Sequence, residues 1–146
     1  MGKEVDYELG NIQVKAKLQD QEAEEIHNPA AVTQKYQFLR EKPKEHFYAV
    51  FLKSDNQVIG DKLISLGTTS NTTVDVKDIV RTASLVNASA VILIHNHPSD
   101  NTQPTETDRE TTQKIQQTLE LLDIQVLDHI IISQNNSYSM KQKGDI

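Results

Sequence analysis

The chain has 146 residues, a formal net charge of −6 and no cysteine, which suits one ordinary domain. Without cysteine, disulfides, thiolate zinc sites and a cysteine nucleophile are excluded, so a bound metal would need His, Asp or Glu ligands. No apolar run approaches the ~20 residues of a membrane span, and the N-terminus lacks the apolar segment of a signal peptide; we therefore expect a cytoplasmic protein.

The start of the chain predicts an arm followed by a compact domain. Residues 7–18 alternate apolar and polar side chains, as an edge strand does. The stretch 18–29 is the most polar of the sequence. We expect an N-terminal arm over residues 1–27, as an edge strand or partly flexible, and a domain over 28–146. Asn28 and Pro29 indicate a helix start, because Asn caps helices and Pro suits their first turn.

The middle of the chain predicts a hairpin and then a helix. Residues 46–53 are rich in β-forming side chains, and a turn at Asp55 and Asn56 leads to a partner strand over 57–67. This pattern is typical of a β-hairpin. Apolar residues then recur at helical spacing after Asp75, which is a natural N-cap.

The last third alternates strand and helix. Residues 90–94 are continuously apolar, as in a central strand covered on both faces. A helix is expected from about Thr105, and the inner face of that helix would contain Ile115, Leu119 and Leu122. Two further strands are expected over 124–133 and near the C-terminus. The whole pattern predicts a mixed α/β fold.

Two histidines that follow the apolar strand are candidate metal ligands. His95 and His97 are one residue apart, so in an extended chain their side chains point to the same face. They leave the strand at its carboxyl end, where α/β proteins place ligands. Asp108 follows after ten residues, on the first turn of the next helix. Two imidazoles and a carboxylate with one open position suit catalytic zinc, although a histidine pair at this spacing is common in ordinary loops.

The stretch HNHPSDNTQPTETD, residues 95–108, resembles the His-x-His-x(10)-Asp motif of the JAMM (JAB/MPN) metalloproteases, and most closely their RadC-like branch. The blocks EHFYAVFLKSDNQVI, VNASAVILIHNHPS and LLDIQVLDHIIIS agree with that branch in the same order. This resemblance implies a cytidine-deaminase-like α/β/α fold with a central mixed sheet flanked by helices. It also implies one zinc ion per chain, held by His95, His97 and Asp108.

The resemblance also implies roles for neighbouring residues. Glu45 matches the family's general acid/base glutamate, and Glu41 is the fallback. Thr105 stands where the family has a serine that helps hold the oxyanion, although this threonine could equally be only a helix cap. His129, which matches the branch's Asp-His pair, is expected to support the ligands or to pack beside them. Ser99 either supports the site or makes a plain loop hydrogen bond.

Asp100 departs from the RadC-like branch, which usually has glycine at this position. Aspartate tolerates the left-handed backbone conformation better than most residues. The turn is therefore expected to survive the change, with one more negative charge near the metal.

The function expected from these features is that of a zinc metallohydrolase, a peptidase or isopeptidase that uses a metal-activated water on a peptide or protein substrate. A strand over 57–66 could pair with an extended substrate backbone. The alternatives are a nucleic-acid-related accessory protein of the DNA-repair RadC type and a non-catalytic assembly domain. The acidic charge argues against nucleic acid without excluding it. The sequence leaves the substrate and homo-oligomerisation open.

Overall fold

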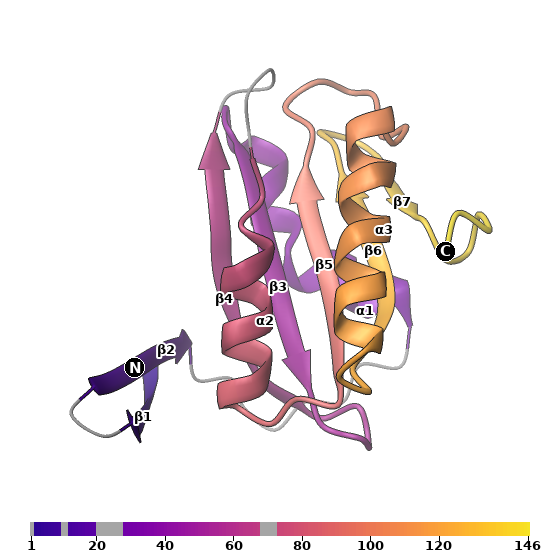
Figure 1. The fold of residues 1–146 in the computed structure, drawn as a ribbon. Coiled ribbons are helices and arrows are strands. Elements are labelled where there is room, and N and C mark those ends of the chain that lie inside the picture. The colour runs from indigo at the N-terminus through magenta and orange to yellow at the C-terminus, as the bar shows by residue number, and fades with distance from the viewer. Residues whose placement is uncertain (1, 10–11, 20–27, 68–72) are drawn as a thin grey trace.

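The computed structural model describes residues 2–9, 12–19, 28–67 and 73–146, and these form a mixed sheet with helices on both faces (Figure 1). The strands are β1 (Gly2–Leu9), β2 (Ile12–Gln19), β3 (Glu45–Leu52), β4 (Val58–Gly67), β5 (Ala90–Asn96), β6 (Gln125–Ile132) and β7 (Ser137–Ser139). The helices are α1 (Pro29–Lys35), α2 (Val76–Leu85), α3 (Glu106–Glu120) and the short 3-10 helix η1 (Gln37–Glu41). The predicted α/β fold is confirmed.

The strand order places β5 in the interior of the sheet, between β3 and β6. In the described residues this order is β1-β2-β4-β3-β5-β6-β7, with β3 antiparallel and β6 parallel to β5. The predicted hairpin is formed by β3 and β4, in which Glu45 lies opposite Gly67. Since β3 runs against β5, with Phe47 opposite His95, the first residue of β3 lies at the end of the sheet where β5 finishes. The topology therefore brings Glu45 and the two histidines to one end.

The two faces of the sheet carry separate apolar clusters. On one face, α2 and α3 bury Ile79, Ala83, Ile115 and Leu119 against β3 and β5. On the other face, α1 and η1 cover the sheet, and their buried contacts are Val32, Tyr36 and Leu39. Every residue of β5 is buried, as its continuous apolar run predicted.

The expected helix starts are confirmed by side-chain caps. Asn28 accepts a hydrogen bond from the Ala31 N–H at 2.9 Å, and Asp75 accepts one from the Asp78 N–H at 3.2 Å. The prediction for Leu122 was wrong. Helix α3 ends at Glu120, and the chain then turns through Asp123 at a φ of 57°, so Leu122 is 49% exposed instead of packing inward.

The N-terminal part forms a hairpin at one edge of the sheet (Figure 1). Where the sequence predicted one edge strand, β1 and β2 are two antiparallel strands. Among the described residues, the register joins β2 to β4 only between Gln19 and Asp61. Most of the polar stretch, residues 20–27, lies outside the described residues. The division into an arm and a domain stays a prediction. Within the described ranges, no helix has the length and apolar character needed to cross a membrane.

Candidate metal centre

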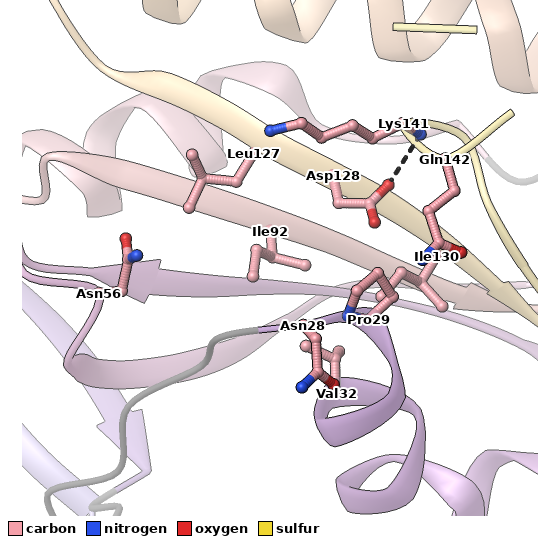
Figure 2. A pocket seen from close by; sticks show the side chains of 10 residues that line it. All are labelled: Asn28, Pro29, Val32, Asn56, Ile92, Leu127, Asp128, Ile130, Lys141 and Gln142. Atoms are coloured by element: carbon pink, nitrogen blue, oxygen red, sulfur yellow. Dashed lines mark hydrogen bonds between the residues drawn. The ribbon is translucent and has the colours of Figure 1, made fainter. Parts of the chain in front are cut away.

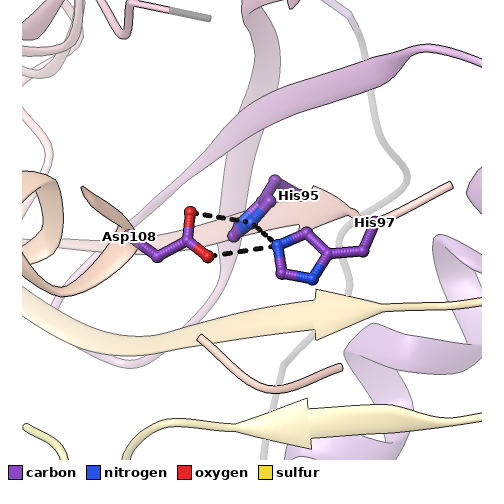
Figure 3. A group of neighbouring side chains, drawn as sticks. All are labelled: His95, His97 and Asp108. Carbon is purple, nitrogen blue, oxygen red and sulfur yellow. Dashed lines mark hydrogen bonds and ion pairs between the residues drawn. The ribbon is translucent and has the colours of Figure 1, made fainter. Parts of the chain in front are cut away.

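His95, His97 and Asp108 come together where β5 ends and α3 begins (Figure 3). The Nε2 atoms of the two histidines are 2.9 Å apart. Asp108 places one carboxylate oxygen 3.1 Å from His97 Nε2 and the other 3.3 Å from His95 Nε2. Four-coordinate zinc, with bonds of about 2.0–2.1 Å, holds its donor atoms about 3.3 Å apart. These three side chains could therefore hold a metal ion with little rearrangement.

The hydrogen bond of His97 to the backbone determines which ring nitrogen is available. His97 Nδ1 lies 2.9 Å from the carbonyl oxygen of Asn101. A carbonyl oxygen only accepts hydrogen bonds, so Nδ1 must carry the hydrogen. In the neutral ring, Nε2 then keeps its lone pair, and this nitrogen faces His95 and Asp108. The loop after β5 thus turns His97 so that its Nε2 could bind a metal ion.

A longer chain of hydrogen bonds orients His95. The hydroxyl of Thr112 donates to the backbone carbonyl of Asp108 at 2.6 Å, so its oxygen must accept from His129 Nδ1, which lies 2.6 Å away. His129 Nε2 is then an acceptor for the Nδ1–H of His95, at 2.6 Å. His95 is left with a lone pair on Nε2, on the side of Asp108. Sequence reasoning placed His129 near the site but missed Thr112.

The charges around the site agree with this arrangement. Burial lowers the pKa of His129 well below its ordinary value, and the positive charge of a protonated His95 would lower it further, so the His129 ring is neutral. Burial alone would raise the pKa of Asp108, but the hydrogen bonds that the His95 and His97 rings donate when they are protonated on Nε2 outweigh burial and hold this pKa below the usual range.

His97 has the opposite shift. Burial would lower its pKa, but the hydrogen bonds to Asp108 and to the Asn101 backbone outweigh burial and raise the pKa above 6.5, with help from the charges of Asp108 and Glu45. The site therefore attracts a cation, either a proton on His97 or a metal ion at the same place.

Glu45 lies beside the three candidate ligands. Together with His95 and Asp108 it lines a cavity of about 30 Å³, which is enough room for a water molecule. Asn96 holds the backbone on both sides of Glu45, because its Oδ1 accepts from the His46 N–H at 2.7 Å and its Nδ2 donates to the Lys44 carbonyl at 3.0 Å. Sequence reasoning also missed this contribution of Asn96, which joins β3 to β5.

Comparison with known proteins agrees with the site and the fold. A family model described as a RadC-like JAB domain matches residues 26–145. The chain belongs to this family. The resemblance read from the His-x-His-x(10)-Asp stretch is therefore confirmed, because the matched region contains that stretch and the strands and helices around it.

The similar curated proteins carry the name UPF0758, which states no activity. The chain is 39% identical over 120 residues to one from Pseudomonas fluorescens (strain Pf0-1), covering 82% of this chain and 54% of that protein. It is 40% identical over 101 residues to UPF0758 protein YfjY of Escherichia coli (strain K12), covering 69% and 63% respectively. The chain spans about half the length of the first of these relatives.

The other residues predicted for the site lie around the trio of His95, His97 and Asp108. Thr105 is exposed and caps α3, since its hydroxyl accepts from the Asp108 N–H at 3.1 Å while its own N–H donates to the Asp108 carboxylate at 2.8 Å. Thr105 is not among the residues that line the small cavity, whereas Thr107 and Thr111 are. The oxyanion role of Thr105 stays a prediction.

Ser99, Asp100 and Glu41 are not among the residues that line the small cavity. The Ser99 hydroxyl accepts from the Asn101 N–H at 3.4 Å, which is the plain loop role. Asp100 does not adopt the left-handed backbone conformation, and its carboxylate accepts from the Ser133 hydroxyl at 3.4 Å. Glu41, the fallback for Glu45, is exposed at the end of η1, in a hollow that contains none of the three candidate ligands.

A larger cavity of the RadC-like JAB domain lies on the opposite face, beside α1 (Figure 2). Its volume is about 340 Å³. The carboxylate in its wall, Asp128, already accepts hydrogen bonds from the backbone N–H groups of His129 and Lys141 and from the Ser139 hydroxyl. The other lining residues are Asn28, Pro29, Val32, Asn56, Ile92, Leu127, Ile130 and Gln142.

Proposed function

We propose that this chain is a zinc-dependent hydrolase of peptide or isopeptide bonds. The observation that supports this most is the convergence of two imidazole Nε2 atoms and one carboxylate within 2.9–3.3 Å of one another. Two imidazoles favour zinc over magnesium or calcium, and three protein ligands leave the fourth position open for reaction. Glu45, which is not one of these three residues, lines the small cavity together with His95 and Asp108.

The residues around the trio can be given roles in hydrolysis. When bound, zinc would polarise the substrate carbonyl and lower the pKa of a water molecule toward ~7. The Glu45 carboxylate would accept a proton from the attacking water and pass it to the leaving amine as the C–N bond breaks. Thr105 keeps its hydroxyl hydrogen after capping α3 and would donate it to the oxyanion. Thr112 and His129 hold the His95 ring in the required tautomer.

The edge of β4 offers a place for an extended substrate. Among the described strands, the register pairs β2 with β4 only at Asp61, whereas β4 continues to Gly67, opposite Glu45. Leu63 and Leu66 on this part of β4 are 38% and 52% exposed. A peptide backbone that added to this edge would run toward the candidate metal centre. Pairing of the substrate backbone with β4 is therefore part of the proposed function.

Metal content tests the proposal first. The purified chain should bind one zinc ion, as measured by elemental analysis and by competition with a coloured chelator. His97→Ala and Asp108→Ala should each lose this ion. His46→Ala is the matched control, because His46 is not one of the three candidate ligands and its ring nitrogen Nδ1 bonds to the Lys44 carbonyl. A folded chain that binds no zinc, or variants that retain it, would refute the proposal.

A further inference from the structure

A groove between α2 and α3 adjoins the small cavity at the candidate metal centre. The small cavity shared by Glu45, His95 and Asp108 is also lined by Val74. Val74 in turn lines a larger hollow of about 720 Å³ whose other walls come from α2 and α3. These two helices lie side by side on one face of the sheet, and α3 begins at the end where β5 finishes (Figure 1). The two hollows are therefore neighbours that share one wall.

The floor of this groove is apolar. Val74, Val76 and Val80 line it, and all three are half-buried and packed against the core beneath them. Their remaining exposed surface faces a hollow rather than a flat part of the protein, so an apolar side chain of a ligand could cover it.

The rim of the groove is basic, although the chain as a whole is acidic. Lys77 and Arg81 come from α2 and Lys114 from α3, and all three are exposed. The one carboxylate in the lining, Asp75, caps α2 through the Asp78 N–H.

Two of these three cations are available to a ligand. Arg81 lies 3.2 Å from Asp78, which also binds Lys62 at 2.7 Å. Within the part of the chain that the structure describes, Lys77 and Lys114 make no ion pair. In a chain with a net charge of −6, this leaves two ammonium groups on opposite sides of an apolar floor, next to the proposed reaction centre.

We propose that this groove binds one side of the substrate, as an extended peptide segment that combines apolar side chains with Asp or Glu. The inference rests on the proposed function and names its substrate class. Apolar side chains of the segment would cover the three valines, while its carboxylates would meet Lys77 and Lys114. Because Val74 lines both hollows, a segment bound in the groove would have its neighbouring residues close to the candidate metal centre.

The test is a binding measurement that needs no turnover, made on zinc-loaded Glu45→Gln protein. The probe is a fluorescein-labelled peptide with two valines and two glutamates in a Gly-Ser background. The matched probe has glutamine in place of glutamate. Two rim ion pairs should make the glutamate peptide bind about tenfold more tightly, and ~0.5 M salt should remove most of this preference.

Charge variants assign the preference to the groove. Lys77→Glu/Lys114→Glu should abolish it, and Lys77→Gln/Lys114→Gln, which removes the charges without reversing them, should reduce it. Lys141→Glu is the control, since Lys141 lines the cavity on the opposite face. Equal affinity of the starting protein for the two peptides, or a preference that is unchanged in the double variants, would overturn the inference. Tighter binding of a labelled single-stranded oligonucleotide, lost in the same variants, would overturn it in favour of nucleic acid.

The zinc content of each protein separates the two proposals. A chain without zinc refutes the metallohydrolase itself. A chain that holds one zinc ion but shows no preference for the acidic peptide refutes only the groove. Because Lys77 and Lys114 are exposed, the double variants should keep their zinc and their unfolding temperature, which verifies that they are folded.

Discussion

Two cavities on opposite faces of the same sheet differ in size and in the side chains that meet in them. The one beside α1 is about 340 Å³ and mostly apolar, and its carboxylate is held by three hydrogen-bond donors of the protein. The one at the end of β5 is about 30 Å³, yet Glu45, His95 and Asp108 all meet there. Converging titratable groups, rather than volume, make the smaller cavity the candidate functional site.

The difference follows from where each cavity lies on the sheet. The larger cavity lies on the face of the sheet that α1 packs against. Helix α1 has only seven residues, so it covers only part of that face. The smaller one lies where β5 ends and the chain leaves for α3, so side chains from three separate elements can approach one point.

Glu45→Gln should abolish most hydrolysis while one zinc ion stays bound. Loss of a general acid/base costs about 10²–10⁴ in rate, and Glu45 is not one of the three candidate ligands. The measurement is kcat/KM for a cleaved peptide, with zinc content determined on the same sample. Glu41→Gln, an exposed carboxylate outside the small cavity, should leave the rate unchanged. Full activity in Glu45→Gln would remove this residue from the mechanism.

Asp128→Ala should lower stability without removing zinc. The change leaves two backbone N–H groups and the Ser139 hydroxyl without their acceptor, and we expect a loss of about 3 kcal/mol in the free energy of unfolding. Urea unfolding monitored by circular dichroism gives this value. Loss of zinc at unchanged stability would mean that the cavity beside α1, and not the end of β5, contains the metal-dependent chemistry.

Thr112→Val should weaken zinc binding by about 10–100-fold, the usual effect of removing a group that orients a metal ligand. Valine cannot accept the hydrogen bond of His129 Nδ1, so the tautomer of His95 is no longer fixed. Thr118→Val is a matched control on the same helix. Its hydroxyl also bonds to the carbonyl four residues earlier, at 2.7 Å, but contacts no histidine in the described structure. Equal losses of zinc affinity in the two variants would show that the effect comes from the helix backbone and not from the hydrogen bond to His129.

The pH dependence of stability should reverse when zinc is added. The pKa of His97 is raised above 6.5 in the folded chain without metal, so its contribution is complete below the unfolded pKa and is lost as pH rises through the folded value. Zinc competes with that proton, so stabilisation by zinc should instead increase over the same rise in pH. Thermal unfolding between about pH 6 and 8, with zinc and with a chelator, measures both trends. Parallel trends would contradict the role of His97 as a ligand.

The sequence predicted those parts of the site that depend on local geometry. Strand alternation was enough to place His95 and His97 together, and the helix start after the loop was enough to bring Asp108 near them. Residues whose roles depend on distant contacts were missed. Thr112 acts through His129 on another element, and Asn96 acts through the backbone beside Glu45, fifty residues earlier along the chain. Leu122 was misplaced because the periodic pattern does not show where α3 ends.

The central place of β5 has a consequence for how quickly different parts of the site exchange amide hydrogens with solvent. Strand β5 is bonded to β3 on one side and β6 on the other, and the His97 N–H continues this pattern by donating to the Ile132 carbonyl at 2.9 Å. Opening these amides requires disruption of the middle of the sheet, so their exchange should be slow with or without metal. The first turn of α3 has no such cover. A metal ion would therefore connect a slowly exchanging strand to a helix end that opens more readily. Metal binding should slow amide exchange at Asp108 and change it little at His95.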